Sequence, residues 1–442
     1  MISRPLDPGE AFFCLSDQVS CMNFVVLAER TGYLEPERIR RALEIVQQEN
    51  ALLQVSIQWT EASGLRFEPA PNRTIELICH PAKAQNWLGV IEQELSKPFP
   101  IGSAPLMRCL YLPIQDADTS APDAAACVLA LTFHHSIADG RAGTDILRHM
   151  LSLMAHDATP PVRSQTTHLP TMAELMPAHY RWTDRPDAAK ALRSTLLADY
   201  RRHGVLPAMP WLATEATGRE PRLIRLQLEA DSSQALIALA RAKGTTVHGA
   251  LCAAQLLAQF KLQQADAPTP FFLSCPVDLR PHLQGQPPVA PTGLFTSLIS
   301  GTFQISPDTD AWELAHEVVT QTRLQIARGE GHLLYHLYGL DGSPVLPQAM
   351  EAFRQKTLAS FPNTMISNLG PIAPVTQDPA VQAISFALCP MPYQTLFTAA
   401  STYNGCLLLN IGYDAQRVTD VCAKALAHSI HDVLMAMSQS AR

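Results

Sequence analysis

The feature that most constrains the fold is a change of hydrophobic period within residues 126–154, ACVLALTFHHSIADGRAGTDILRHMLSLM. Residues 127–133 form a mainly apolar run with the length of a buried strand. His134 and His135 follow this run, and Asp139 closes the loop after them. Beyond the loop, apolar residues recur at steps of three and four, the spacing of one helical face: Ile146, Leu147, Met150, Leu151 and Met154. The pattern predicts a strand, a sharp loop with two imidazoles and a carboxylate, and a helix.

The loop suits proton-transfer chemistry, because histidine titrates near neutral pH and the end of a strand holds it rigidly. Asp139 lies four residues beyond His135, close enough to fold back and fix the loop. The alternative is a hydrogen-bonded core residue, which is commoner for a single histidine beside an apolar run. The whole pattern H-H-x-x-x-D-G, however, is expected by chance in about one chain of this length in a thousand. The complete motif therefore favours a functional interpretation.

HHSIADG, residues 134–140, resembles the HHxxxDG signature of the condensation-domain and acyltransferase superfamily. That superfamily includes chloramphenicol acetyltransferase, the condensation domains of peptide synthetases and the polyketide-associated protein acyltransferases. The chain is most similar to its stand-alone polyketide-associated acyltransferases and free-standing condensation enzymes. The second histidine of the signature is the active-site base of the family, and the matching residue here is His135.

Two further segments support the resemblance by their order along the chain. PVDLR, residues 276–280, is similar to a family motif whose arginine pairs with the aspartate of the histidine motif, which implies an ion pair between Arg280 and Asp139. The local alternative is an ordinary surface arginine after a strand. MISNLG, residues 365–370, is similar to the family's S-N-x-G segment, which implies that Asn368 faces the substrate tunnel.

The resemblance also implies roles for the other residues of the loop. Asp139 braces the loop through the arginine and affects the rate by positioning. His134 points to the other side of the strand from His135 by the period-two rule, and is interpreted as a structural hydrogen-bonding residue. Gly140 is expected to let the chain turn tightly near the reacting centre. The sequence names no oxyanion donor.

The fold implied by the resemblance is α/β, with two chloramphenicol acetyltransferase-like subdomains in a V-shaped pseudo-dimer and the active site in a tunnel at their junction. We expect an N-terminal acyltransferase subdomain over residues 1–160, which carries HHSIADG. A linker and helical connection is expected over 161–220, and a C-terminal acyltransferase subdomain with PVDLR and SNLG over 221–442. Because the two subdomains already form the cleft, we expect a monomer.

Composition argues against several other classes of protein. Of 442 residues, 47% are hydrophobic and 17% are charged, which is typical of a large globular protein. The formal charge of -7 argues against nucleic acid as a partner. There is neither a signal-peptide pattern nor an apolar stretch long enough for a membrane span, so we expect a cytoplasmic protein. The ten cysteines include no C-x-x-C pair, which predicts reduced thiols and no metal site.

Periodicity predicts further elements on both sides of the histidine loop. We expect helices over 35–50, 86–95, 232–242, 247–264, 311–327, 346–359 and 418–437, and strands over 22–28, 53–59, 106–114, 223–228, 271–277 and 298–305. Asn404 and Gly405 predict a hairpin turn. Residues 115–125 are interpreted as an exposed loop and 156–170 as a linker. The arginines of residues 181–202 indicate a solvated helix face, or else a docking surface for an acidic carrier protein or a nucleotide phosphate.

Motifs of other enzyme classes are absent from the sequence: G-x-S-x-G, H-E-x-x-H, G-x-x-x-x-G-K-[ST] and G-x-G-x-x-G. Acyl transfer from a thioester needs a base and a place for the tetrahedral oxyanion, but no metal and no covalent protein intermediate. We therefore expect an acyltransferase without a permanently bound cofactor. It would move an acyl group from coenzyme A or an acyl carrier protein to the hydroxyl of a small-molecule acceptor, in natural-product or lipid biosynthesis.

Two alternatives stay open. A free-standing condensation enzyme would use the same base to form an amide with an amine acceptor, on a chain bound to an acyl or peptidyl carrier protein. A non-catalytic docking protein would keep the fold without turnover. The intact set of His135, Asp139 and Arg280 argues against the docking protein, which has no need of the base.

Overall fold

The computed structural model describes residues 3–62, 64–115, 126–155, 170–181, 184–202, 209–213, 219–284, 292–333, 335, 346–358, 360 and 362–439. Its first half comprises β1 (Arg4–Pro5), α1 (Pro8–Ser20), β2 (Asn23–Arg30), α2 (Pro36–Glu49), η1 (Ala51–Gln54), β3 (Val55–Thr60), β4 (Gly64–Pro69), β5 (Leu77–Cys79), α3 (Trp87–Leu95), β6 (Met107–Pro113), β7 (Cys127–His134) and α4 (Gly140–Met154). The connection carries α5 (Met172–Leu175), η2 (Ala178–Tyr180) and α6 (Pro186–Arg202).

The second half comprises β8 (Pro221–Leu228), α7 (Ala230–Ala242), α8 (Val247–Gln263), β9 (Thr269–Asp278), η4 (Arg280–His282), β10 (Thr296–Ile305), α9 (Ala311–Ala327), η5 (Glu330–His332), α11 (Leu346–Leu358), β11 (Asn363–Pro371), β12 (Val381–Leu388), β13 (Gln394–Tyr403), β14 (Cys406–Asp414) and α12 (Asp420–Gln439). The fold is thus mixed α/β with two subdomains, which confirms the predicted class.

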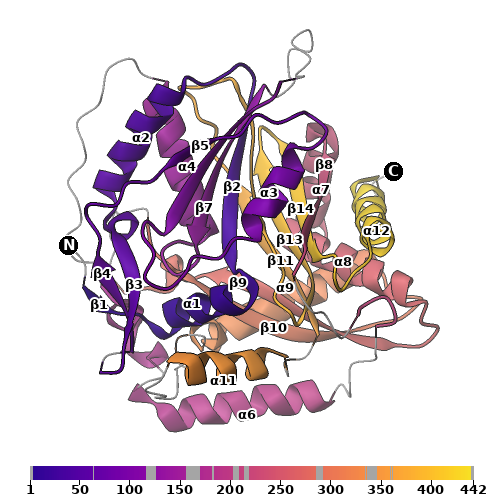
Figure 1. The fold of residues 1–442 in the computed structure, drawn as a ribbon. Helices are drawn as coiled ribbons and strands as arrows, with labels where there is room; N and C mark the ends of the chain where they lie inside the picture. Colours follow the sequence, from indigo (N-terminus) through magenta and orange to yellow (C-terminus); the bar gives the residue numbers. More distant parts are fainter. Residues whose placement is uncertain are drawn as a thin grey trace.

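The strand before the histidine motif lies inside the first sheet, a five-stranded sheet in the order β12-β2-β7-β6-β5. β7 pairs antiparallel with β2 on one side and β6 on the other, and all its residues are buried. Leu129, Leu131 and Phe133 join one core cluster, whereas Val128 and Ala130 join a second one on the opposite face. Figure 1 shows α2 and α4 on one side of this sheet and α3 on the other. Because both faces are covered, the strand is apolar almost throughout.

Helix α4 is held close to the sheet, and this fixes the loop at its N-terminus. A Cβ at Gly143 would lie 2.9 Å from Phe24 Cε2 and 3.2 Å from Phe133 Cε2, so only glycine allows this approach. The predicted apolar face of the helix, including Ile146, Leu147 and Met150, is buried. Strand, loop and helix therefore follow the prediction from the hydrophobic period.

The second sheet has six strands in the order β10-β9-β11-β13-β14-β8. β11 is parallel to both β9 and β13, and the other pairs are antiparallel. Helix α8 packs against α9 and α12 beside this sheet, in the right half of Figure 1. A third, three-stranded sheet in the order β1-β4-β3 lies next to α1.

β12 joins the two halves of the molecule. It lies within residues 221–442, yet it pairs antiparallel with β2 in the first sheet. A Cβ at Gly412 of β14 would collide with the Leu388 carbonyl oxygen, so the end of β12 also approaches the second sheet closely. The division into residues 1–160, 161–220 and 221–442 stays a prediction.

Most predicted elements match the structure within a few residues. The bounds of α9 coincide with the prediction, and Asn404 and Gly405 form the predicted turn with φ of 48° and 82°. The sequence reasoning missed α1 and the strands β1, β4, β5, β11 and β12. The exposed loop and the linker expected at 115–125 and 156–170 lie almost entirely outside the described residues. Arg201 and Arg202 at the end of α6 are exposed.

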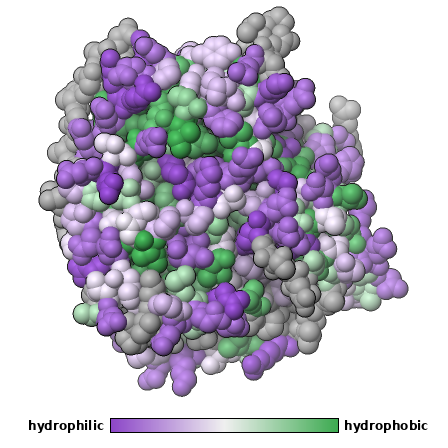
Figure 2. All heavy atoms as spheres, viewed as in Figure 1, coloured by the Kyte–Doolittle hydropathy of each residue, from purple (hydrophilic) through white to green (hydrophobic). Residues whose placement is uncertain are grey.

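The surface of the molecule is more hydrophilic than its interior, as expected for a globular chain. Figure 2 shows one face covered mainly by hydrophilic residues, with hydrophobic residues gathered in its upper part. Among the described helices, none has the length and apolar character needed to cross a membrane.

Candidate active site

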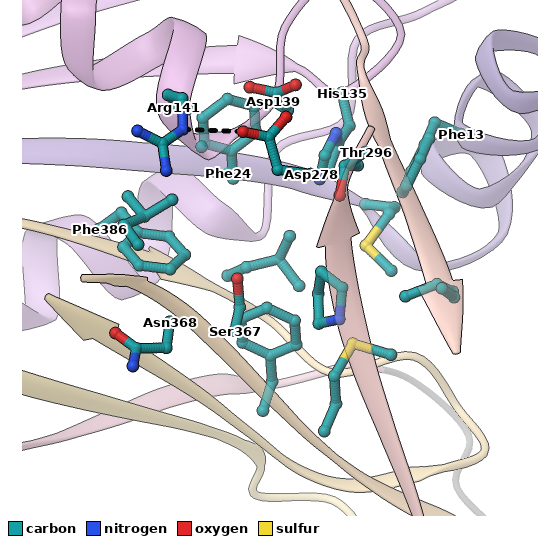
Figure 3. Close-up of a pocket in the computed structure, with 18 of the residues that line it drawn as sticks. Phe13, Phe24, His135, Asp139, Arg141, Asp278, Thr296, Ser367, Asn368 and Phe386 are labelled. Carbon is teal, nitrogen blue, oxygen red and sulfur yellow. Dashed lines mark ion pairs between the residues drawn. The ribbon is translucent and has the colours of Figure 1, made fainter. Parts of the chain in front are cut away.

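A cavity of about 110 Å³ lies between the two halves of the molecule. The first half contributes residues from α1, β2, the histidine loop and α4, and the second half contributes residues from β9 to β13. Figure 3 shows His135 between Phe13 and Phe24, with Ser367 and Asn368 across the cavity. The residues that line it are Phe12, Phe13, Met22, Phe24, His135, Asp139, Gly140, Arg141, Pro276, Asp278, Arg280, Thr296, Leu298, Met365, Ser367, Asn368, Leu369, Phe386, Leu388, Tyr393, Gln394 and Phe397.

His135 follows the last residue of β7, and its side chain forms part of the cavity wall. Its ring stacks on Phe13 with a centroid distance of 3.9 Å and an interplanar angle of 13°, and it lies 4.8 Å from the Phe24 ring. Nδ1 is buried and makes no hydrogen bond of ordinary geometry among the described residues. Nε2 is therefore the ring nitrogen that can meet a ligand.

Burial keeps the His135 ring neutral. The residue is 9% exposed, and removal of the ring from water lowers its pKa to about 4. Backbone groups of His135 and Ala138 and the Asp139 carboxylate oppose this shift without cancelling it. At neutral pH the imidazole can accept a proton, which is the property required of a general base.

His134 is buried away from the cavity. It is 1% exposed, it does not line the cavity, and burial lowers its pKa to about 3. Its Nδ1 accepts a hydrogen bond from the Ser136 backbone N–H at 3.1 Å. The Ser136 hydroxyl donates to the Glu10 carbonyl at 2.6 Å, which ties the histidine loop to α1.

Asp139 is the N-cap of α4 and uses both carboxylate oxygens in bonds to the protein. Oδ1 accepts from the Ala142 backbone N–H at 2.9 Å, and Oδ2 accepts from the Phe295 backbone N–H at 2.9 Å. Nη2 of Arg280 lies 3.0 Å from the carboxylate, so the ion pair implied by the family resemblance is present. The carboxylate therefore joins the histidine loop to the second half.

The ion pair extends into a chain of alternating charges along the cavity. Asp278 lies 3.0 Å from Nη1 of Arg280 and 3.1 Å from Nε of Arg141 at the start of α4, and the second of these pairs is marked in Figure 3. The Arg280 guanidinium also lies 4.6 Å from the centre of the Phe295 ring. The sequence reasoning missed Asp278 and Arg141 as site residues, although Asp278 stands inside the PVDLR segment.

Gly140 and Asn368, two of the predicted site residues, also lie in the cavity wall. Gly140 has no left-handed conformation, and the tight turn expected at this residue stays a prediction. A Cβ there would lie 3.3 Å from Leu369 Cδ2, and glycine permits a close approach between the two halves. Asn368 lines the cavity, and its Oδ1 accepts from the Gly370 backbone N–H at 2.9 Å.

Phe13 is the clearest residue that sequence reasoning missed, because α1 was not predicted. The signal for this helix was present: Asp7 is its N-cap, Pro8 its first residue, and Glu10 completes a capping box. The helix is fixed further because Asp7 Oδ2 accepts from the Met172 backbone N–H at 2.7 Å. α1 thus brings an aromatic ring onto the active-site histidine.

Comparisons with known proteins point to one group. Residues 217–388 match a family model described as "Phthiocerol/phthiodiolone dimycocerosyl transferase C-terminus". The phthiocerol/phthiodiolone dimycocerosyl transferase of Mycobacterium tuberculosis is 29% identical over 208 residues, which cover 46% of this chain and 48% of that protein. The match therefore spans about half the length of this curated relative.

Solved structures share the fold over nearly the whole chain. Polyketide synthase associated protein 5 from Mycobacterium tuberculosis has a TM-score of 0.66 at 18% identity and covers 99% of this chain and 98% of its own. A trichothecene 15-O-acetyltransferase from Fusarium sporotrichioides has a TM-score of 0.72 at 14% identity, with coverages of 98% and 95%. The first condensation domain of the CDA synthetase has a TM-score of 0.73 at 14% identity, with coverages of 99% and 96%.

Proposed function

We propose that this chain, a member of the superfamily of condensation domains and chloramphenicol acetyltransferase-like acyltransferases, transfers an acyl group from a thioester to a hydroxyl and so forms an ester. The observation that carries the proposal is the neutral imidazole of His135 in the wall of a largely apolar cavity between two subdomains. Such a site can bring the reacting ends of a thioester and an alcohol together away from bulk water.

His135 acts as the general base in this proposal. Its Nε2 takes the proton of the acceptor hydroxyl while the oxygen attacks the thioester carbon. The tetrahedral intermediate then collapses, the carbon–sulfur bond breaks, and the leaving thiolate takes the proton back from the imidazolium. The products are an ester, a free thiol and the neutral ring, so protons and charges balance without a redox partner.

Asp139 and Arg280 act as positioning residues. Their ion pair holds the loop at Asp139 against the second half, and the Phe13 ring limits the orientation of the imidazole. Because the Asp139 carboxylate is occupied by Ala142, Phe295 and Arg280, its effect on the rate runs through geometry. His134 and Gly140 support the same arrangement, and Asn368 is a candidate contact for substrate.

The lining of the cavity favours an apolar acyl group. Met22, Leu298 and Phe397 are among the many apolar side chains of its wall. Its volume of about 110 Å³ is smaller than the cavity of about 150 Å³ that holds one benzene molecule. The enclosed part therefore accommodates the reacting carbonyl and the first few carbons, and a longer chain has to continue along the junction.

An ester is favoured over an amide by the named activities of similar proteins. The name of the trichothecene 15-O-acetyltransferase states acyl transfer to oxygen, and the dimycocerosyl transferase is named for transfer of an acyl group to phthiocerol or phthiodiolone. Condensation domains share the same fold. Amide formation on a carrier-bound chain is the second candidate. Coenzyme A or an acyl carrier protein as donor, a cytoplasmic location and a monomeric state remain predictions.

The direct test is turnover of purified protein with a panel of acyl thioesters and with alcohol and amine acceptors. His135→Ala should lower kcat by about 10²- to 10⁴-fold, with an unchanged circular dichroism spectrum. His428→Ala, which removes a histidine whose side chain is 79% exposed on α12, is the matched control and should keep full activity. Equal turnover of His135→Ala and the wild type would reject the base. Thioester binding by the wild type without any turnover would favour the docking protein.

A further inference from the structure

A second group of reactive side chains lies outside the cavity, between α8 and β9. His248 and Cys252 are four residues apart on α8, so they lie on the same face of the helix. Cys275 of β9 faces them. Cys252 is 0% exposed, Cys275 is 4% exposed, and His248 is half-buried.

The ligand atoms of this group already have the spacing of a coordination sphere. Cys252 Sγ lies 3.6 Å from His248 Nε2 and 3.9 Å from Cys275 Sγ, and all three ligand atoms lie within 4.8 Å of one another. A tetrahedral zinc ion with Zn–S near 2.3 Å and Zn–N near 2.0–2.1 Å separates two sulfurs by about 3.8 Å and a sulfur and a nitrogen by about 3.6 Å. The two distances from Cys252 Sγ therefore agree with a tetrahedral site to within about 0.1 Å.

Two simpler explanations are available for the same contacts. A disulfide needs sulfurs about 2.05 Å apart, which the separation of 3.9 Å does not satisfy. Ordinary packing of two buried thiols against an imidazole accounts for one close pair, but it does not require three ligand atoms to converge on one point. Two thiols and an imidazole that point at one another are the ligands that a thiophilic divalent cation prefers.

We propose that His248, Cys252 and Cys275 bind one Zn²⁺ ion, with water in the fourth position. Binding releases the two thiol protons, and the two thiolates then balance the charge of the ion. This balance permits burial of the ion, since an uncompensated charge would be costly there. The proposed ligands come from a His-x-x-x-Cys turn and from a strand further along the chain, so they form no C-x-x-C pair.

The site lies directly behind one wall of the active-site cavity. Side chains alternate along β9, so Cys275 faces α8, whereas Pro276 and Asp278 line the cavity. A bound ion would fasten β9 to α8 at the position from which Asp278 holds Arg280 and Arg141. The ion would thus act on the position of β9, and the proposal does not rest on the proposed acyl transfer.

The first experiment measures zinc content. Wild type freed of its purification tag is incubated with zinc sulfate, dialysed and analysed by mass spectrometry for metals. We expect about one zinc per chain in the wild type, and at least a tenfold lower content in Cys252→Ser and Cys275→Ser. Cys14→Ser is the matched control, because Cys14 is also a fully buried free thiol, and it should keep the metal. Zinc should also raise the Tm of the wild type and leave that of Cys275→Ser unchanged.

Several outcomes would overturn the site. Wild type that retains no zinc, or serine variants that retain it, would exclude these ligands. A mass two daltons lower, with Cys252 and Cys275 blocked to alkylation until reduction, would show a disulfide instead. Retention of Cu⁺ but not Zn²⁺ would overturn the zinc assignment. If the serine variants do not fold, alkylation of the wild type decides: zinc should slow the modification of Cys252 and Cys275 at least tenfold and leave Cys14 unaffected.

Discussion

Two strand–loop–helix units of this molecule use the same device to hold their loops. In the first half β7 leads to α4, and Asp139 between them lies 3.0 Å from Arg280. In the second half β14 leads to α12, and Asp414 at the end of the strand lies 3.0 Å from Arg219. Both carboxylates are buried, and both accept backbone hydrogen bonds.

The two units differ in what surrounds the carboxylate. Arg280 comes from the opposite half of the molecule, and its pair with Asp139 lines the cavity next to His135. Asp414 follows a tyrosine, Tyr413, and neither lines that cavity. A buried carboxylate–arginine pair is thus a way to fix a loop after a strand. Acyl-transfer chemistry additionally needs an imidazole in that loop and a cavity beside it.

The largest effect that separates the two units should come from matched aspartate substitutions. Asp414→Asn leaves the half-buried Arg219 without its counter-charge and should lower the free energy of unfolding by about 3 kcal/mol. Arg280 keeps its pair with Asp278 after Asp139→Asn, so this variant should lose less stability. Only Asp139→Asn should also lower kcat/KM, by about 10- to 100-fold, because only this pair positions His135. Urea unfolding and kcat/KM per folded molecule measure the two quantities. An equal loss of kcat/KM in both variants would contradict the proposal that only the Asp139–Arg280 pair positions His135.

The pH dependence should report the buried imidazole. Burial lowers the pKa of His135 to about 4, so the base is already neutral at pH 7. We expect kcat/KM to stay level down to about pH 5 and to fall about tenfold per unit below about pH 4. Because the unfolded chain takes up this proton first, the folded state also loses stability as the pH falls from about 6.5 towards 4.

Rate measurements therefore need circular dichroism at each pH to identify the range in which the protein stays folded. Asp139 raises the pKa of His135 through its charge, so Asp139→Asn should move the acid limb to lower pH. Asp414→Asn should leave the limb where it is. An acid limb near pH 6.5 in the wild type would show that the titrating base is not the buried ring.

The smallest effect should come from the aromatic support of the imidazole. Phe13→Leu removes the ring stacked on His135 at 3.9 Å and should lower kcat/KM a few-fold, as expected for an aromatic contact of about 1 kcal/mol. Phe271→Leu is the matched control, because Phe271 is also buried and packs on Phe260 in the second half. This control should lose stability without a change in kcat/KM. If both variants lost the same fraction of kcat/KM, the loss would come from weaker packing of the core and not from the missing stack on His135.

The sequence determined the local part of the site. The change of period around residues 126–154 predicted β7, the histidine loop and α4, because alternation and helical spacing are properties of neighbouring residues. Resemblance to a family, rather than periodicity, pointed to the pair of Asp139 with Arg280, which are 141 residues apart. The position of the loop and the identity of its motif are therefore encoded in one short stretch of the chain.

The tertiary structure alone decided several other contacts between distant parts of the chain. Phe13 on α1, the Asp278–Arg141 contact, the crossing of β12 into the first sheet and the meeting of Cys252 with Cys275 depend on how helices and sheets pack. These contacts carry no local period, since each joins elements that are far apart in the chain. The depressed pKa of His135 has the same origin, because burial in the folded chain, and not the motif itself, keeps the ring neutral.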